Sequence, residues 1–374
     1  MKRDEYLHKI KQAFEVNPAV ALLGPRQCGK TTLAKTYAQS FKNILFLDLE
    51  NPVHLAKLES PMLALDKEYD LIVIDEIQRR PELFLILRVL IDQKERRQKF
   101  LLLGSASREL IRQSSETLAG RISYLELTPF CLFETGEMKK LWLRGGFPQS
   151  FLAKNDRVSL AWRDSYITTF LEQDIPSLGF HVPPMQIRRF FMMLAHCHGN
   201  ILNVSELGVS LGVSHTAINN YLSILTGTFM IRQLLPWFEN IHKRQIKSPK
   251  IFFRDSGIFH ALLKISSEED LYFHPKLGAS WEGFAIEEVI KKLGLPPEQC
   301  FFWGVHAQAE LDLLVFINNK KIGFEIKYNE APTMSKSMHL AMELLKLDEL
   351  NIIYPGKTNY LLRDNIKVCS LEEF

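Results

Sequence analysis

Cysteine is scarce in this 374-residue sequence, and none of its 5 cysteines stands in a CxxC pair. This scarcity argues against a disulfide framework and a thiolate metal site, and it predicts a reducing, cytoplasmic setting. No apolar run reaches the ~18 residues that a bilayer-spanning helix needs, so we expect no membrane association. The first ten residues, MKRDEYLHKI, have scattered charges and no apolar core, which argues against a secretory signal.

The sequence also has little excess of either positive or negative charge. The 46 Lys and Arg residues against 43 Asp and Glu residues give a net charge of +3. Bulk charge therefore gives no argument for nucleic acid, and any basic footprint must be local. Apolar residues make up 46% of the chain, which excludes disorder for most of it. At roughly 150 residues per domain, the length predicts two or three domains.

Short apolar segments alternate with helix-like segments up to about residue 130. The apolar segments are 20–24, 43–49, 71–75, 100–104 and 122–127. They are typical of buried parallel strands, and the alternation predicts an α/β sheet with helices on both faces. The stretch from 151 to about 235 is mostly helical in pattern, and strand signals return near 250. We therefore expect three domains, at 1–140, 141–250 and 251–374.

A phosphate-binding loop is predicted at 24–31, where GPRQCGKT matches GxxxxGK[ST] in full. The motif follows a predicted strand and opens a predicted helix, so backbone N–H groups and the helix N-terminus would face a phosphate. We expect Lys30 to reach the β- and γ-phosphates of ATP and Thr31 to ligate Mg²⁺. The predicted nucleotide-binding residues are Gly24, Pro25, Arg26, Gln27, Cys28, Gly29, Lys30, Thr31 and Thr32.

Polar residues also end two of the other predicted strands. LIVIDE carries Asp75 to the carboxyl end of a buried strand, where ligands of open α/β sheets bind. We expect Asp75 to hold Mg²⁺ and Glu76 to polarise the attacking water as a general base. In FLLLGSAS the strand is followed by Ser105, which either senses the γ-phosphate or orients the water, or only forms a turn or caps a helix.

The middle of the chain has the pattern of a helix-turn-helix. Apolar spacing over 204–225 predicts two helices that meet in a tight turn at Gly212. The second helix would expose His215, Thr216, Asn219 and Asn220, and Asn can pair with adenine. That helix has no Lys or Arg, but a basic run follows at 241–250. This run is either the wing of a winged helix on a DNA backbone or an ordinary solvated surface.

Two acidic residues and one lysine in the last part of the chain form a recognisable pattern. Asp312 lies in ELDLLVF, and Glu325 and Lys327 share one face of the strand-like GFEIKY. Asn318-Asn319 suits a two-residue hairpin loop, which places Asp312 opposite Glu325. Two carboxylates ~5 Å apart repel each other unless a cation lies between them. We therefore expect Mg²⁺ or Mn²⁺ on Asp312 and Glu325, and Lys327 beside an activated water.

The 20–130 region resembles the ATPase core of the AAA+ class, and the whole chain resembles a prokaryotic family of AAA+ ATPases with a C-terminal domain of unknown function. The matching stretches include GPRQCGKTTL, LIVIDEIQ, GSAS, GGFPQSFL, KIFFRDSG and WEGF. The resemblance makes Arg121 a candidate for contact with the γ-phosphate, in its own subunit or a neighbouring one, unless it is a surface arginine. Relatives commonly carry Arg where Gln173 precedes Asp174, so both a ring and a monomer remain open.

Cys28 stands where the family usually has a small apolar residue. A helix N-terminus and Lys30 close to the thiol predict a lowered pKa for Cys28. Alkylation of Cys28 is then expected to block nucleotide binding, and bound ATP to protect the thiol.

The D…ExK pattern resembles the PD-(D/E)xK fold of restriction endonucleases and resolvases. The resemblance implies that Glu282, in the helix-like SWEGFAIEEVI, joins the C-terminal site, with Glu287 and Glu288 less favoured. It implies metal-assisted phosphodiester hydrolysis, or else a degenerate fold whose charges form salt bridges.

Taken together, the sequence predicts an α/β protein with three parts. These are a P-loop AAA+-like ATPase domain with a parallel sheet, a helical winged-helix-like middle and a C-terminal α/β restriction-endonuclease-like domain. The leading hypothesis is an ATPase that couples ATP hydrolysis to DNA processing, with a nuclease site in its last domain. The alternative is a nucleotide-gated regulatory module that has an inactive nuclease fold and a protein partner.

Overall fold

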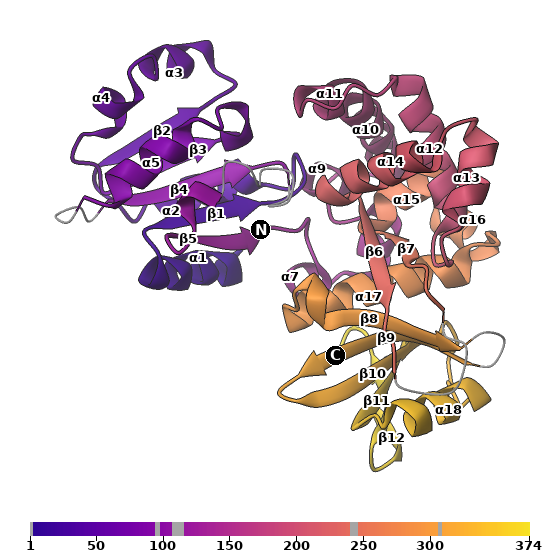
Figure 1. Ribbon diagram of the computed structural model, residues 1–374. Helices are drawn as coiled ribbons and strands as arrows, with labels where there is room; N and C mark the ends of the chain where they lie inside the picture. The colour runs from indigo at the N-terminus through magenta and orange to yellow at the C-terminus, as the bar shows by residue number, and fades with distance from the viewer. Residues whose placement is uncertain (1–2, 94–97, 107–115, 240–245, 306–308) are drawn as a thin grey trace. The chain divides into compact units, whose positions relative to one another are not determined.

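The computed structural model describes residues 3–93, 98–106, 116–239, 246–305 and 309–374, which form two compact units (Figure 1). The first unit holds Met1–Pro129 together with Asp174–Phe180 and Gly227–Phe229, and the second unit holds the rest. None of the helices in these ranges has the length and apolar character needed to cross a membrane.

A parallel five-stranded sheet forms the centre of the first unit, in the order β2-β3-β4-β1-β5. Each strand lies within one residue of the limits expected from the sequence. The strands are β1 (Ala19–Leu23), β2 (Ile44–Asp48), β3 (Leu71–Asp75), β4 (Lys99–Gly104) and β5 (Ile122–Glu126). Three of them, β1, β3 and β4, are buried along nearly their whole length, which explains their continuous apolar sequences.

Helices cover both faces of this sheet. Along β1, Val20 and Leu22 pack in one core with α1 and α2, whereas Ala21 and Leu23 pack in another with α5. The alternation follows from the two-residue period of a strand and confirms the expected α/β layering. The helices of the unit are α1 (Asp4–Val16), α2 (Lys30–Ala38), α3 (Pro52–Lys57), α4 (Pro61–Leu65), α5 (Leu83–Ile91) and α11 (Ile175–Ser177), with short 3₁₀ turns η1 (Ile77–Arg79) and η2 (Glu116–Leu118).

An eight-stranded mixed sheet organises the second unit, in the order β12-β13-β11-β10-β9-β8-β6-β7. Its strands are β6 (Ile231–Pro236), β7 (Lys250–Phe253), β8 (Cys300–Val305), β9 (Ala309–Ile317), β10 (Lys320–Ile326), β11 (Glu349–Tyr354), β12 (Tyr360–Arg363) and β13 (Ile366–Ser370). The antiparallel pair β6–β7 continues the C-terminal strands because β6 pairs with β8. The helical middle and the last part of the chain therefore share one sheet.

Many helices of the second unit precede this sheet in the chain, and others lie between its strands in sequence. They are α7 (Leu132–Thr135), α8 (Met138–Arg144), α9 (Pro148–Phe151), α10 (Asp156–Thr169), α12 (Pro184–Cys197), α13 (Val204–Leu211), α14 (His215–Gly227), α15 (Ser256–Leu262), α16 (Glu268–Phe273), α17 (Leu277–Leu293) and α18 (Lys336–Leu345), with a π-helix η3 (Phe170–Asp174) and a 3₁₀ turn η4 (Pro297–Gln299). Apolar residues of α17 share one core with β9 and β10, and those of α18 share another with β9 and β11.

The predicted helix pair is present in the middle segment. α13 ends at Gly212, whose φ of 69° lies in the left-handed region that suits glycine, and α14 follows. The side chain of Asn203 caps α13, and the Ser214 hydroxyl accepts a bond from the backbone N–H of Ala217 at the start of α14.

Two glycine-containing motifs interlock in the second unit, which explains a sequence feature without evident chemistry. Gly145 and Gly146 of GGFP lie against Asp255 of RDSG, whose Oδ2 accepts a 2.7 Å bond from the Gly146 N–H. A Cβ on Gly145 would lie 2.1 Å from Asp255 Oδ1, and a Cβ on Gly257 would lie 2.1 Å from the Arg144 carbonyl oxygen. Glycine is therefore required on both sides of this contact for steric reasons.

Candidate functional site

The phosphate loop connects β1 to α2 at the carboxyl edge of the parallel sheet. Gln27 and Gly29 have φ values of 61° and 101°, so the loop turns through two left-handed residues before the helix begins. A Cβ on Gly24 would lie 2.1 Å from the Leu127 carbonyl oxygen, which leaves room only for glycine. Pro25 lies within the loop and Thr32 in the first turn of α2. The backbone therefore forms the predicted loop before a helix N-terminus.

Lys30, Thr31 and Asp75 meet in this loop. The Lys30 ammonium donates to the carbonyl oxygens of Gly24 at 2.9 Å and Pro25 at 2.8 Å. The Thr31 hydroxyl donates to Asp75 Oδ2 at 2.6 Å. A hydroxyl and a carboxylate at the end of adjacent elements are the oxygen donors that Mg²⁺ prefers, so these two residues fit the predicted metal of an ATP complex. Burial is the main cause that raises the pKa of Asp75.

Glu76 forms a polar triangle with Gln78 and Ser105. The Ser105 hydroxyl donates to Glu76 Oε2 at 3.0 Å, and Gln78 Nε2 donates both to Glu76 Oε2 and to Ser105 Oγ. Glu76 itself has a φ of 56°, a left-handed conformation that is rare for residues with a side chain. Ser105 thus contacts the predicted base. Sequence reasoning gave Gln78 no role, although it stands two residues after Glu76.

Arg26 links the loop to acidic residues that sequence reasoning also missed. Its guanidinium pairs with Asp174 and with Glu50, and Arg79 donates to the same Glu50 oxygen at 2.9 Å. Desolvation opposes the charge of Arg26, but Asp174 outweighs it together with the other carboxylates and raises its pKa. The only sequence signal for Asp174 was the departure noted at its neighbour, Gln173.

One expectation about the ATP site is corrected, and another is narrowed. Burial raises the pKa of Cys28, because desolvation of the wholly buried thiol raises it more than the charge of Lys30 lowers it.

Arg121 precedes β5 at the amino edge of the sheet. The length of the strand, about 16 Å, separates it from the edge that holds the phosphate loop. Its guanidinium pairs with Asp92 at 2.6 and 3.1 Å. Arg121 therefore does not join the site of its own chain, which leaves contact with a neighbouring copy or the role of a surface arginine.

The predicted hairpin between β9 and β10 is confirmed. Asn318 and Asn319 form its loop with φ values of 50° and 62°, and the ladder runs from Ile317–Lys320 to Leu313–Phe324. The next pair along this register is Asp312 and Glu325. Asp312 Oδ2 accepts a 2.8 Å bond from the Ile326 N–H, and Lys327 donates to Glu325 Oε1 at 2.7 Å.

Lys250 lies beside Asp312, one of the two carboxylates on which a metal ion was expected. Its ammonium lies 3.0 Å from Glu282 Oε1 and 3.7 Å from Asp312 Oδ1, and it also pairs with Glu310. Within the described ranges, no three His, Cys, Asp or Glu residues are arranged to hold a metal ion. The residues do not fit the Mg²⁺ or Mn²⁺ expected on Asp312 and Glu325. We call Lys250, Glu282, Glu310, Asp312, Glu325 and Lys327 the C-terminal cluster.

Two carboxyls of the C-terminal cluster have strongly raised pKa values. Burial and then the charge of Asp312 raise the pKa of Glu282 to about 7 and that of Glu325 to about 8. Glu287 and Glu288 lie elsewhere, as the sequence indicated. Glu287 forms a buried pair with Arg232, which helps to lower its pKa to about 2 against the effect of burial.

The described part of the middle segment has the expected exposed face on α14 and corrects the expectation for Lys250. The predicted outer face of α14 is exposed, with side chains of His215, Thr216, Asn219 and Asn220 at the surface. Lys243 and Arg244 of the basic run lie outside the described residues. Lys247 is exposed, but Lys250 is only 2% exposed and belongs to the C-terminal cluster. Lys250 is therefore not a phosphate contact of a wing.

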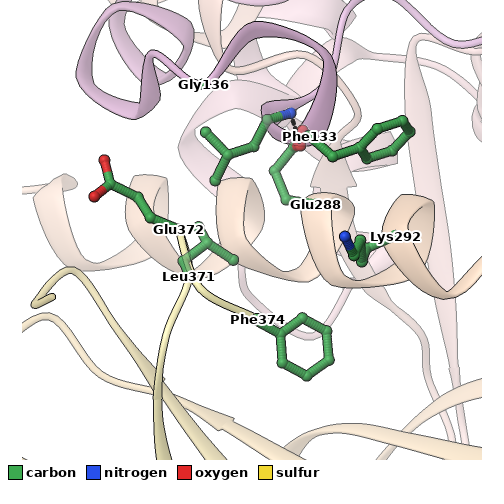
Figure 2. A pocket seen from close by; sticks show the side chains of 8 residues that line it. Phe133, Gly136, Glu288, Lys292, Leu371, Glu372 and Phe374 are labelled. Carbon is green, nitrogen blue, oxygen red and sulfur yellow. Dashed lines mark hydrogen bonds between the residues drawn. The ribbon is translucent and has the colours of Figure 1, made fainter. Parts of the chain in front are cut away.

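A separate pocket of about 220 Å³ lies beside the C-terminus (Figure 2). Phe133, Lys292 and Phe374 line it, together with Glu288. The Glu288 carboxylate accepts a 2.6 Å bond from the Leu132 N–H, which ties this side chain to the fold. None of the residues that line this pocket belongs to the phosphate loop or to the C-terminal cluster.

Comparisons with known proteins divide the chain into three parts. An AAA domain model matches residues 16–136, a domain of unknown function (DUF8612) matches 135–269, and a second domain of unknown function (DUF4143) matches 277–374. The uncharacterized proteins Rv2008c of Mycobacterium tuberculosis and Mb2031c of Mycobacterium bovis are each 45% identical over 368 residues. The alignment covers 98% of this chain and 83% of each relative.

Solved structures show more distant similarity. The Walker-type ATPase of Pyrococcus abyssi is 14% identical, with 70% of this chain and 95% of that chain covered and a TM-score of 0.49. The T158V variant of Thermotoga maritima RuvB is 19% identical, with 62% and 90% covered and a TM-score of 0.31.

Proposed function

The chain belongs to the family of the two mycobacterial relatives and carries an AAA domain, and from this premise we propose that it is an ATP-hydrolysing molecular switch. The observation that carries the proposal is the 2.6 Å contact between Thr31 and Asp75, with Glu76 next in the chain. This contact joins the end of the phosphate loop to the end of β3. An ATP-bound metal would need both the Thr31 hydroxyl oxygen and the Asp75 carboxylate oxygen there.

Each residue of the site has a distinct role in this proposal. The loop amides and Lys30 bind the phosphates, and Lys30 exchanges two backbone carbonyl oxygens for phosphate oxygens when ATP enters. Thr31 and Asp75 would hold Mg²⁺, which neutralises charge on the transferred phosphoryl group when bound. Glu76 accepts a proton from the attacking water. Ser105 and Gln78 fix the Glu76 carboxylate, since both donate to its Oε2.

Two substitutions separate binding from hydrolysis. Lys30→Ala should weaken ATP binding by at least tenfold because the phosphates lose their only ammonium among these residues. Glu76→Gln should retain binding but lower turnover by about 100-fold or more, the usual contribution of a general base. Glu15→Gln, on the exposed side of α1, is the matched control. Undiminished phosphate release in Glu76→Gln would refute the assignment of the base.

DNA is the second element of the proposal, and one observation favours it. The exposed face of α14 follows a glycine turn, and the antiparallel pair β6–β7 comes next, an order that fits a winged helix. We infer that the ATPase cycle is coupled to DNA through this segment. Stimulation of ATP hydrolysis by DNA, lost in Asn219→Ala with Asn220→Ala and weakened by salt, supports this coupling.

If DNA does not change the rate of ATP hydrolysis, the result would favour the alternative, a nucleotide-gated regulatory module with a protein partner. Asn155→Ala is a control in the same assay, because Asn155 caps α10 and lies outside the helix pair. If the control variant loses the stimulation as fully as the α14 variant, the effect does not come from the exposed face of α14.

A further inference from the structure

The C-terminal cluster holds more carboxylates than ammonium groups. Glu282, Glu310, Asp312 and Glu325 bring four carboxyls together, whereas Lys250 and Lys327 bring two ammonium groups. Carboxylates held close together repel one another, and a cation among them lowers the energy of the group. The excess of acidic groups therefore creates a position for a cation, and the question is which cation occupies it.

Lys250 is fixed in that position by the sheet. It is the first residue of β7, where it pairs with Leu234 of β6, and an isolated bridge joins it to Ile201. Its side chain passes the rings of Phe252 and Phe302, whose centroids lie 6.0 and 5.8 Å from Nζ. Backbone pairing and aromatic packing thus hold the ammonium among the carboxylates.

A divalent ion on Glu282 and Asp312 would use oxygens that Lys250 already engages. Ligand oxygens of Mg²⁺ or Mn²⁺ lie at roughly 2.0–2.2 Å from the metal. An ion on Glu282 and Asp312 would then lie next to the Lys250 ammonium, which approaches oxygens of both residues to 3.0 and 3.7 Å. Repulsion between the two cations is strong in a buried setting. Either the lysine or the metal can occupy the cluster.

One acceptor in the cluster remains available for a metal. Glu325 is only 4% exposed, and its Oε2 is buried and takes no hydrogen bond from any described residue. Its other oxygen pairs with Lys327. A buried carboxylate oxygen without a partner is the acceptor that an incoming cation would use first.

We propose that Lys250 is the resident cation of the C-terminal cluster and that it keeps divalent metal ions out of this site. The proposal does not depend on ATP hydrolysis, which takes place in the other unit. Its consequence is that the C-terminal domain carries the D…ExK pattern without metal-dependent cleavage. Removal of the Lys250 charge converts the cluster into a divalent-metal site.

Mn²⁺ binding to the full chain without nucleotide tests the proposal, with bound ions counted by electron paramagnetic resonance. Lys250→Met should bind one more Mn²⁺ than the wild-type protein, and Lys250→Met with Asp312→Asn should lose that ion. Lys327→Met is the matched control, because it removes the other ammonium of the cluster and leaves Lys250 in place. It should bind the same number of ions as the wild type.

Three results would overturn the proposal. The first is a wild-type Mn²⁺ site that disappears in Asp312→Asn, and this comparison needs no change at Lys250. The second is a folded Lys250→Met protein, verified by circular dichroism, that gains no ion. The third is an equal gain in Lys327→Met. If Lys250→Met does not fold, Lys250→Gln replaces it, since glutamine keeps hydrogen-bond donors in the cluster without the charge.

Discussion

Replacement of Gly257 by alanine should destabilise the second unit severely, although it adds one methyl group. The new Cβ would lie 2.1 Å from the Arg144 carbonyl oxygen, 2.4 Å from its carbon and 2.7 Å from the Gly145 nitrogen. All three neighbours are backbone atoms, so no side chain can rotate away. Overpacking costs about 1–3 kcal/mol when side chains can adjust, and a rigid backbone places Gly257→Ala at about 3 kcal/mol or more.

Gly278→Ala is the matched control. Gly257 and Gly278 are each the second residue of a helix, α15 and α17, and a Cβ on Gly278 would meet no atom within 4 Å. Alanine favours a helix over glycine by about 1 kcal/mol, so Gly278→Ala should leave stability unchanged or raise it. The difference between the two variants isolates the steric contact from helix propensity.

Thermal unfolding followed by circular dichroism measures this difference. For a unit of 150–250 residues, 1 kcal/mol corresponds to roughly 2–4 °C, so Gly257→Ala should melt about 6–12 °C below the wild type. Binding of a fluorescent ATP analogue reports on the first unit and should not change at low temperature. A melting point within about 2 °C of the wild type, or an equal loss in Gly278→Ala, would refute the steric argument.

Two further predictions concern the charged groups of the two sites. Asp174→Asn removes a carboxylate that neutralises Arg26 in the phosphate loop. ATP should therefore bind about 3- to 10-fold more tightly at low salt, and the gain should fade at high salt. An unchanged or weaker affinity in a nucleotide titration would contradict this prediction. The raised pKa values of Glu282 and Glu325 mean that the folded state holds protons which the unfolded state releases, so stability should fall as pH rises from about 5 to about 8. Asp312→Asn should flatten this fall in denaturant titrations, because it removes the like charge, and an equally steep fall would count against the assignment.

The ATP site was largely predictable because segments that are contiguous in the sequence determine its backbone. A strand, a glycine loop and a helix N-terminus follow one another without a gap, and the short apolar strands showed where each loop must emerge. The interactions of Arg26 with Asp174 and of Glu76 with Gln78 were not predictable. The first joins residues 148 positions apart, and the second depends on the left-handed backbone of Glu76.

Position along a strand explains why Arg121 lies away from the phosphate loop of its own chain. The sequence shows only that Arg121 precedes a strand, and in a parallel sheet the residues that precede strands lie at the edge away from the ligand. The same rule correctly placed Asp75, the last residue of β3, and Ser105, which follows β4. Arg121 was assigned from resemblance rather than from this rule, and the surface pair with Asp92 is the result that the rule favours.

The C-terminal cluster shows why a motif can place side chains on neighbouring strands and still leave their chemistry open. Turn preference and strand period determine the hairpin, so Asp312 and Glu325 could be placed on neighbouring strands from the sequence. Lys250 comes from β7, in a run that looked like a solvated basic surface, and only the pairing of β6 with β8 joins its strand to that sheet. A positive charge contributed by a distant strand leaves the D…ExK pattern intact and changes what the carboxylates can bind. The number of charges in the assembled cluster therefore decides between a metal site and a closed ion-pair network, and the motif alone does not.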